Sequence, residues 1–237
     1  MRPFFSYYGA KWTGARHYGH PRRDLVIEPF AGSACYSTRW SPARVRLYDV
    51  SPDICDLWDF LIYASLRDIE SIPDVFHRNE DFLSLARGPR LLVSFWVAKG
   101  RAEPAGNLSS WYRAYQNARD CRVWGPAVKR RILAQKPALK SWTIDCISWE
   151  NIPLEDAHWH IDPPYNNAPG SRYPHSKIDY GALGAWCRSL PGPVDVCENE
   201  GASWLPFEPL YEVVSTRGRV SSHRSKESIW RNENARS

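Results

Sequence analysis

Short apolar runs alternate along the chain with longer amphipathic stretches. This alternation is typical of α/β layers around a sheet, because a buried strand is apolar throughout whereas a covering helix is apolar on one face only. The apolar runs predict strands at residues 25–27, 45–50, 142–149, 158–161 and 194–197. Residues 34–40 are just long enough for a helix between the first two strands, so these strands should be parallel and joined by a right-handed crossover.

Helical spacing and turn residues predict further elements. Apolar residues recur at helical spacing after Ser51-Pro52, and residues 178–190 fit the helix between the last two strands. Residues 211–214 and 219–230 look like the two strands of an antiparallel hairpin.

The middle of the chain has a different pattern. Residues 68–140 predict short helices broken at proline and glycine, with no clear strand. The chain has no internal repeat and no low-complexity linker. We therefore expect one α/β domain, formed by residues 1–67 and 141–237, with a mainly helical insertion at 68–140.

Positive charge is concentrated in that insertion. The whole chain has 237 residues and a net charge of +5, but residues 87–142 contain twelve Lys or Arg and only two acidic residues. The rest of the chain is net negative, apart from a second basic region at residues 217–237, and the hairpin at residues 217–231 should likewise contact backbone phosphate. A basic segment of this kind favours a polyanionic partner.

Other features bound the class of protein. With 43% hydrophobic residues the chain can bury a core, which excludes fibrous and disordered classes. No leader and no run of about eighteen apolar residues is present, so we expect a soluble, cytoplasmic protein with no membrane partner. The six cysteines form no CxxC pair and should be reduced, and His158 and His160 lack a third ligand, so no metal site is expected.

The strongest chemical motif is Asp162-Pro163-Pro164-Tyr165, directly after an apolar strand. Two prolines fix an extended backbone without N–H donors, so their carbonyls can accept from a ligand beside the Asp carboxylate. Such a site can hold an exocyclic amine while the Tyr ring stacks on the base that carries it. It can orient the amine lone pair toward an electrophile without a covalent intermediate. Standing alone, the motif would more often be a structural Pro-Pro turn capped by Asp; here it does not stand alone.

Two further motifs lie at strand ends. Residues 28–33, Glu-Pro-Phe-Ala-Gly-Ser, end the first strand where α/β folds place a small-residue loop against a ligand. Asp49 ends the second strand, where an acid can accept from ribose hydroxyls. As a glycine motif the loop is unspecific, because only Gly32 is present and Ala34 stands where a second glycine is expected. Adenosine cofactors of several kinds would therefore fit it.

Together these residues resemble the Dam-type DNA adenine methyltransferases, which use S-adenosylmethionine. Tyr7-Tyr8-Gly9-Ala10-Lys11 resembles the N-terminal cofactor motif, and residues 197–207 resemble a segment of phage-borne members. The resemblance implies a Rossmann-like methyltransferase sheet with helices on both faces and an inserted target-recognition segment. It assigns catalysis to Asp162, Pro163, Pro164 and Tyr165, and cofactor contacts to Tyr7, Lys11, Glu28, Phe30, Ala31, Gly32, Ser33 and Asp49.

The implied partner is duplex DNA with the target base flipped out. Aromatics interleave with Arg and amides at residues 109–119, which suits contact with bases; a helix with Trp111 and Tyr115 facing the core explains the aromatics equally well. The expected DNA contacts are Arg113, Gln116, Asn117, Lys129, Arg130 and Arg131.

Several alternatives stay open. Cytosine-N4 or RNA could be the acceptor, since both present an amine on a planar ring, and the protein could be an idle nucleic-acid-binding relative. Asp145 and Glu150 both lie where the cofactor adenine is expected, and the sequence does not choose between them. The target sequence, the biological role and the oligomeric state are not encoded in any motif.

Overall fold

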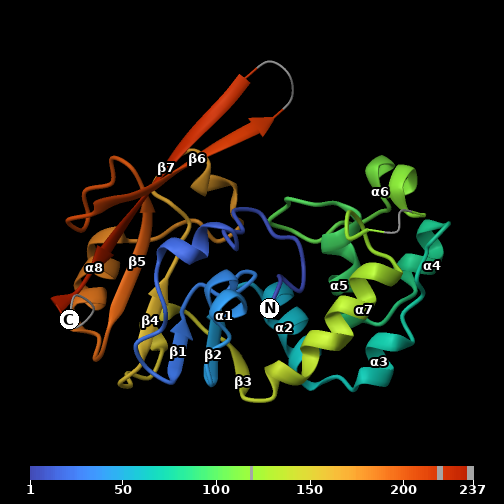
Figure 1. Cartoon of the computed structure of the whole chain (residues 1–237), viewed down its shortest axis with the longest axis horizontal. Helices are drawn as coiled ribbons and strands as arrows, with labels where there is room; N and C mark the ends of the chain where they lie inside the picture. Colours follow the sequence, from blue (N-terminus) through green and yellow to red (C-terminus); the bar gives the residue numbers. More distant parts are fainter. Residues whose placement is uncertain (118–119, 218–220, 234–237) are drawn as a thin grey trace.

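The protein is described by a computed structural model that covers residues 1–117, 120–217 and 221–233, with backbone only for 213–217 and 221–225. Seven strands form one sheet in the order β3-β2-β1-β4-β5-β7-β6 (Figure 1). They are β1 (Leu25–Glu28), β2 (Arg44–Asp49), β3 (Trp142–Cys146), β4 (His158–Ile161), β5 (Val194–Asn199), β6 (Glu208–Arg217) and β7 (Ser221–Arg231).

The first five strands of the sheet order are parallel, and β7 runs antiparallel to both β5 and β6. The expected α/β class, the parallel pairing and the C-terminal hairpin are therefore confirmed. One strand is shorter than predicted, because β3 ends at Cys146 and Trp149–Asn151 form a 3-10 turn. The mostly parallel sheet with flanking helices is compatible with a Rossmann-like fold.

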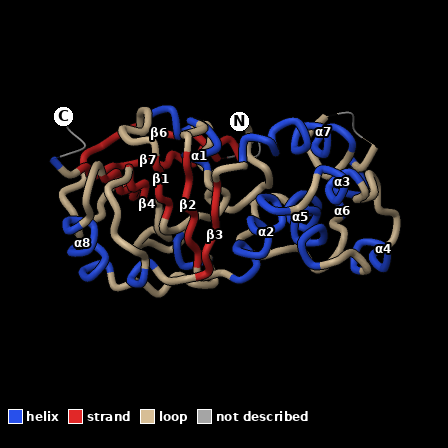
Figure 2. Tube along the Cα trace, turned by 90° about the horizontal axis from the view of Figure 1, so that it is seen from below, coloured by secondary structure: helices blue, strands red, loops and turns tan. Residues whose placement is uncertain are grey.

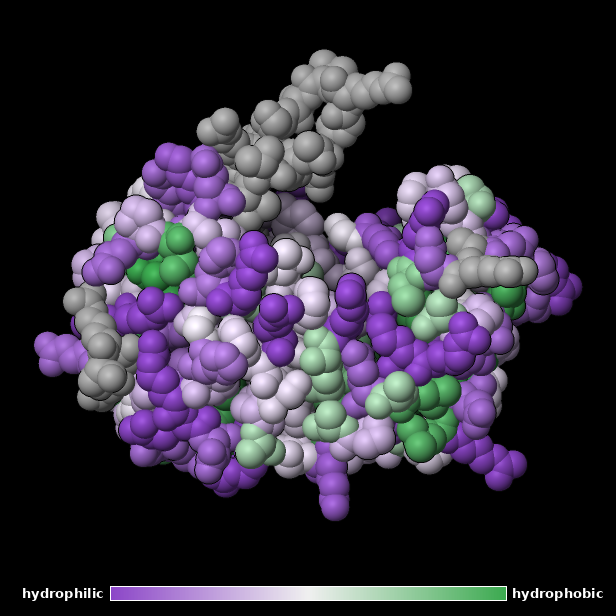
Figure 3. All heavy atoms as spheres, viewed as in Figure 1, coloured by the Kyte–Doolittle hydropathy of each residue, from purple (hydrophilic) through white to green (hydrophobic). Residues whose placement is uncertain are grey.

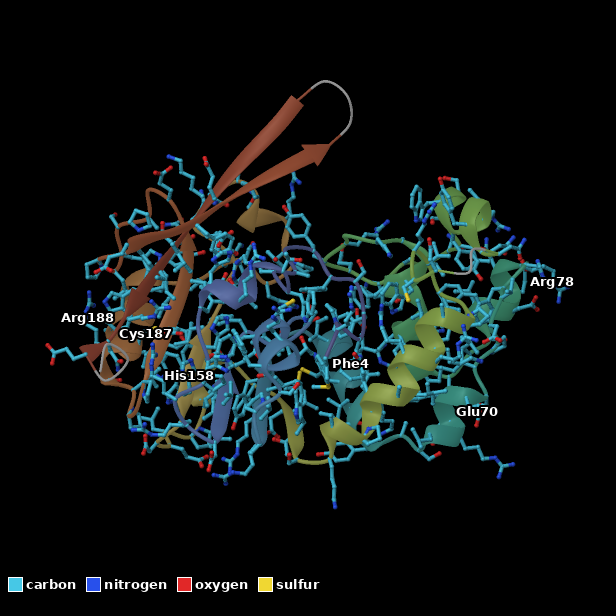
Figure 4. All side chains as sticks on the ribbon, viewed as in Figure 1. Phe4, Glu70, Arg78, His158, Cys187 and Arg188 are labelled. Carbon is cyan, nitrogen blue, oxygen red and sulfur yellow. The ribbon has the colours of Figure 1, made fainter. Side chains whose placement is uncertain are left out.

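Helices cover both faces of the sheet (Figure 2). Val26 of β1 packs with Tyr36 of α1 (Cys35–Trp40), while Leu25 and Ile27 point to the opposite face, where α8 (Tyr180–Ser189) supplies Cys187. Figure 4 shows Cys187 and its exposed neighbour Arg188 at the left of the view, close to the C-terminal end of the sheet order. Alternation of side chains along β1 thus fills two separate cores.

The segment between α2 (Pro52–Tyr63) and β3 is helical in its described residues and lies beyond the β3 edge (Figure 1). Its core is continuous with that of the sheet, since Val45 of β2, Trp58 of α2 and Trp124 belong to one apolar cluster. Its elements are α3 (Leu66–Glu70), α4 (Asn79–Leu83), α5 (Arg87–Val97), α6 (Ser110–Tyr115), α7 (Pro126–Gln135) and η2 (Lys136–Leu139).

The N-terminal segment packs at the junction of sheet and insertion. The Trp96 indole donates to the Phe4 carbonyl at 2.9 Å, and the Arg131 guanidinium donates to the Pro3 carbonyl at 3.1 Å. Phe4 itself is fully buried against Trp58, and Figure 4 shows it between the sheet and the insertion. A few residues at the start of the chain therefore hold both parts.

Candidate functional site

A pocket lies where the strand order reverses. β1 is flanked by β2 and β4, so the chain leaves the carboxyl ends of β1 and β4 in diverging directions, and α/β folds bind ligands in that crevice. The pocket is open on one side, and its empty space is about 800 Å³ with the adjoining solvent included. Its lining includes Tyr7, Lys11, Glu28, Phe30, Ala31, Gly32, Ser33, Asp49, Asp162 and Pro164.

Gly32 shapes the floor of the pocket. Its φ is +44°, and a Cβ at this position would lie 3.1 Å from the Tyr7 ring. Its N–H donates to Asp49 Oδ2 at 3.0 Å, and its carbonyl accepts from the Trp58 indole at 2.8 Å. The loop is therefore held on both sides, and a side chain at position 32 would need both a left-handed backbone and a shift of the Tyr7 ring by a few tenths of an ångström.

Ala34 has the left-handed backbone that explains why glycine was expected there. Its φ is +45° and ψ is +51°, immediately before α1 begins. A non-glycine residue in this region costs roughly 1–2 kcal/mol. Ala34 thus adopts the left-handed backbone conformation that a glycine would have at this position of the loop.

Glu28 ties the loop to helix α1. Its side chain is buried and accepts from the Ser37 N–H, in the first turn of α1, at 2.9 Å. Burial raises the pKa of Glu28 to about 7, although the hydrogen bonds from Ser37 oppose this. This carboxyl therefore anchors the helix that follows the loop.

Asp49 is suited to accept from a pair of hydroxyls. Its Oδ2 accepts from the Gly32 N–H, and its Oδ1 accepts from the Ser51 N–H at 2.9 Å. Each carboxylate oxygen can accept more than one hydrogen bond, so acceptor capacity remains on the pocket side. Burial raises the pKa of Asp49, and these backbone donors oppose the rise. The residues present thus fit an adenosine cofactor.

A second cluster gathers around Lys11 at the edge of the pocket. The Lys11 Nζ lies 2.5 Å from Asp162 Oδ1, also contacts the Tyr165 hydroxyl, and sits 3.9 Å from the centre of the Tyr165 ring. Glu227 Oε2 accepts from the Tyr165 hydroxyl and lies 3.7 Å from Lys11 Nζ. Sequence reasoning missed Glu227; the available signal was a single acid at the apolar end of the last predicted strand.

The protonation of this cluster follows from its charges. Burial opposes the charge of Lys11, but Asp162 and Glu227 together hold the pKa of Lys11 well above its usual value. Burial and the two carboxylates raise the pKa of Tyr165. At neutral pH Lys11 is therefore a cation and Tyr165 keeps its proton.

The two prolines of the motif differ in what they offer a ligand. Pro164 lines the pocket, but its carbonyl already accepts from the Tyr180 hydroxyl at 2.5 Å. The expectation that both proline carbonyls are free is therefore wrong for Pro164. Pro163 and Tyr165 line a neighbouring groove instead of the pocket.

The loop after Tyr165 folds back over the site, which the sequence did not indicate. The Asn167 N–H donates to the Tyr165 carbonyl at 2.7 Å, and Gly170 packs against the same backbone. Farther along, the Tyr173 hydroxyl donates to the Tyr8 carbonyl at 3.0 Å, and Tyr173 lines the pocket. This loop forms one wall of the site.

The groove runs from the base of the hairpin to the insertion and encloses about 3590 Å³, open solvent included. In Figure 3 the surface is hollowed between the α6 end of the molecule and the sheet end. The groove meets the pocket at Lys11 and Asp162, which line both. The cations of its lining are Arg2, Lys11, Arg16, Lys99, Arg131, Arg172 and Lys226, and its acids are Asp162, Glu200, Glu212 and Glu227.

Of the six expected DNA contacts, Arg131 alone appears among the groove lining of the described residues. Its guanidinium lies 5.1 Å from the centre of the Trp96 ring. Lys129 is largely buried, with 12% of its side chain exposed. It pairs with Asp74 at 2.6 Å and donates to the carbonyls of Glu70, the last residue of α3, and Ile72. Its role is to hold α7 against the turn after α3.

The rest of the basic helix region is also partly used within the fold. Arg113 donates to the His77 carbonyl at 3.0 Å, Gln116 is half-buried, and Asn117 and Arg130 are exposed. The core aromatic of α6 is Tyr112, whose hydroxyl accepts from the Phe76 N–H at 2.9 Å. Trp111 is 47% exposed, and its ring lies tilted against that of Tyr115 with 4.2 Å between the ring centres, so the alternative that Trp111 faces the core is wrong.

Other candidates from the sequence have structural surroundings. His158 and His160 are buried, and each ring stacks with the Tyr36 ring, with 5.2 and 4.2 Å between ring centres. Burial lowers the pKa of His160 to about 4. Within the ranges that the structure covers, no group of three or more possible ligands could hold a metal, and no helix is long and apolar enough to cross a bilayer.

Comparison with known proteins adds little to this geometry. No family model matches the chain, and no curated protein matches it. A solved structure described as a conserved hypothetical protein of Streptococcus pyogenes is similar at a TM-score of 0.39 with 11% identity, over 91% of this chain and 88% of that chain. At this level the likeness indicates nothing about what the protein does.

Proposed function

We propose that the protein is a cytoplasmic S-adenosylmethionine-dependent methyltransferase that methylates the N6 amine of adenine in DNA. The observation that carries this proposal is the meeting of a small-molecule pocket with a large basic groove at Asp162 and Lys11. A methyltransferase needs one site for the methyl donor and one for the polymer, and it needs a hydrogen-bond acceptor for the target amine where the two sites meet.

The donor would lie in the pocket. Asp49 is suited to the ribose hydroxyls, and the loop at residues 28–33 with Tyr7 encloses the remaining space. When bound, S-adenosylmethionine would supply the methyl group and leave as S-adenosylhomocysteine, and the acceptor amine would release one proton to solvent at the groove. The chain itself binds and orients the two substrates and excludes water from the space between them.

The acceptor would enter from the groove. Its seven cations against four acids suit a phosphate backbone. An amine inside a duplex is shielded by stacking, so the base must leave the helix to reach Asp162. Asp162 would accept from the amine, the Pro163 carbonyl would accept beside it, and the Tyr165 ring would stack on the base.

The test is transfer of a labelled methyl group from S-adenosylmethionine to unmethylated DNA of mixed sequence, followed by nucleoside analysis. We expect N6-methyladenine, and sequencing of the product identifies the target. N4-methylcytosine, or label in RNA only, would change the acceptor but keep the reaction class. Absence of label in DNA and RNA, with the donor bound in the pocket, would favour the idle relative.

A further inference from the structure

The cluster around Lys11 holds one cation between two carboxylates. Lys11 Nζ is 2.5 Å from Asp162 Oδ1 and 3.7 Å from Glu227 Oε2. The side chains are largely buried, with 16% of Lys11, 27% of Asp162 and 6% of Glu227 exposed. Their charges leave one net negative charge in the cluster.

In the structure, Lys11 forms an ion pair with Asp162, the carboxylate that the proposed reaction needs. The acceptor amine must hydrogen-bond to Asp162, and positive charge grows on its nitrogen as the methyl group arrives. A carboxylate that is still paired with an ammonium has no net charge to offset it. Lys11 must therefore move away from Asp162 or be neutralised by another group.

Glu227 is placed to receive it. Its Oε2 is already within ion-pair distance of Lys11, and the Tyr165 hydroxyl donates to the same atom and fixes it. The strand β7 holds Glu227 between two neighbours, opposite Asn199 of β5 and Tyr211 of β6. The distance that Lys11 must cover is thus short, and the receiving carboxylate is rigid.

We propose that Glu227 is a positioning residue that takes over the ammonium of Lys11 when the acceptor amine binds Asp162, so that Asp162 keeps its negative charge for the amine. This inference rests on the proposed function. It assigns to the C-terminal hairpin a part in the chemistry that is separate from contact with nucleic acid.

Glu227→Gln tests the charge alone, because Gln keeps the shape and an acceptor oxygen for the Tyr165 hydroxyl. We expect kcat/KM for DNA to fall by about tenfold or more, the equivalent of one hydrogen bond to a charged group, while the KM for S-adenosylmethionine is unchanged. Glu227→Asp, which keeps the charge at a shorter reach, should recover part of the loss. Glu70→Gln is the matched control, since it makes the same change at an exposed site that lines neither the pocket nor the groove.

A binding measurement separates this role from a structural one. In the presence of S-adenosylhomocysteine, wild-type protein should bind a duplex with adenine at the target position about tenfold tighter than one with purine, which lacks the amine. Glu227→Gln should lose this preference because Lys11 stays on Asp162.

The outcomes distinguish the two proposals. If wild-type protein transfers no methyl group, the proposed function and this inference both fail. If wild-type protein is active and Glu227→Gln retains its preference for adenine over purine, whatever its rate, the inference alone is overturned. Should Glu227→Gln not fold, the same comparison with Glu227→Asp decides, with a reduced preference expected.

Discussion

Gly170 lies so close to Tyr165 that a Cβ on Gly170 would be 1.8 Å from the Tyr165 carbonyl oxygen. The carbonyl carbon and the amide nitrogen of Tyr165 are also within 3 Å of that position. No real Cβ fits such a space, so the loop after the Asp162 motif and the motif itself are packed as one backbone unit.

Gly170→Ala should therefore move the Tyr165 backbone and lower methyl transfer strongly, by roughly a hundredfold, because a shift of about 1 Å at the reacting groups costs that much. Cofactor affinity should fall much less than the rate, since Asp49 and Gly32 lie at the ends of other strands, although the loop supplies Tyr173 to the pocket wall. Gly106→Ala is the control, because its added Cβ meets open space. Steady-state rates and calorimetric titration with S-adenosylmethionine check this, and a rate like that of Gly106→Ala would contradict it.

Asp49→Ala should weaken binding of S-adenosylmethionine by roughly 5- to 150-fold, because hydroxyls in the pocket lose a charged acceptor worth about 1–3 kcal/mol. Calorimetric titration measures the change. Asp56→Ala, which removes an exposed carboxylate on the neighbouring helix α2, should leave the affinity as it is. Equal affinities for both variants would remove Asp49 from the site.

Asp162→Ala should lower the rate of transfer by a factor of about 10²–10³ at saturating substrates, because the group that acts on the acceptor amine is gone. Binding of S-adenosylmethionine should stay largely intact. Asp156→Ala, an exposed partner of Arg23, serves as the control for charge. Turnover of Asp162→Ala near the wild-type rate would exclude the proposed mechanism.

Glu28 should make stability depend on pH. Its ordinary pKa is 4.5, and burial raises it to about 7 in the folded protein. Between these values the folded protein holds a proton that the unfolded chain has lost, so the free energy of unfolding falls as pH rises, by about 3 kcal/mol in all.

Glu28→Gln should remove this fall while keeping an acceptor for the Ser37 N–H, and it should be more stable than wild type at pH 8. Denaturant unfolding from pH 4.5 to 8 measures the effect. Glu70→Gln, an exposed site at the outer end of the insertion in Figure 4, should follow the wild-type profile. Parallel profiles for Glu28→Gln and wild type would show that Glu28 ionises normally.

Arg16 and Arg172 are exposed cations of the groove, and their joint replacement by Ala should flatten the dependence of log affinity for DNA on log salt by about two units. Arg130→Ala and Arg78→Ala together remove two exposed cations that are not part of the groove lining. That pair should leave the slope unchanged. The opposite ranking would place the nucleic acid on the outer surface of the insertion.

The sequence was sufficient for the sheet and for most of the pocket. Apolar runs mark the buried strands directly, and the motifs that follow β1, β2 and β4 converge because carboxyl ends of parallel strands meet at one edge. Glu227 and Tyr173 could not be placed this way, since a hairpin strand and a loop reach the site only through tertiary packing.

The orientation of single side chains on α7 was also beyond the sequence. A helix has 3.6 residues per turn, so consecutive cations point about 100° apart and cannot share one face. Lys129 turns inward to Asp74, Arg131 reaches the groove, and Arg130 stays in solvent. The side chains of the basic hairpin residues Arg217, Arg219 and Arg224 lie outside the described residues, so their expected phosphate contacts stay predictions.

The first eleven residues couple the two halves of the molecule mechanically. Pro3 and Phe4 are fastened to the insertion through Arg131 and Trp96, and only a few residues later Tyr7 and Lys11 line the pocket. The insertion therefore cannot shift against the sheet without pulling on both pocket residues. We therefore expect a polymer that moves α5 or α7 to alter the affinity for the small ligand, and thermodynamic linkage would then require the small ligand to alter the affinity for that polymer by the same factor.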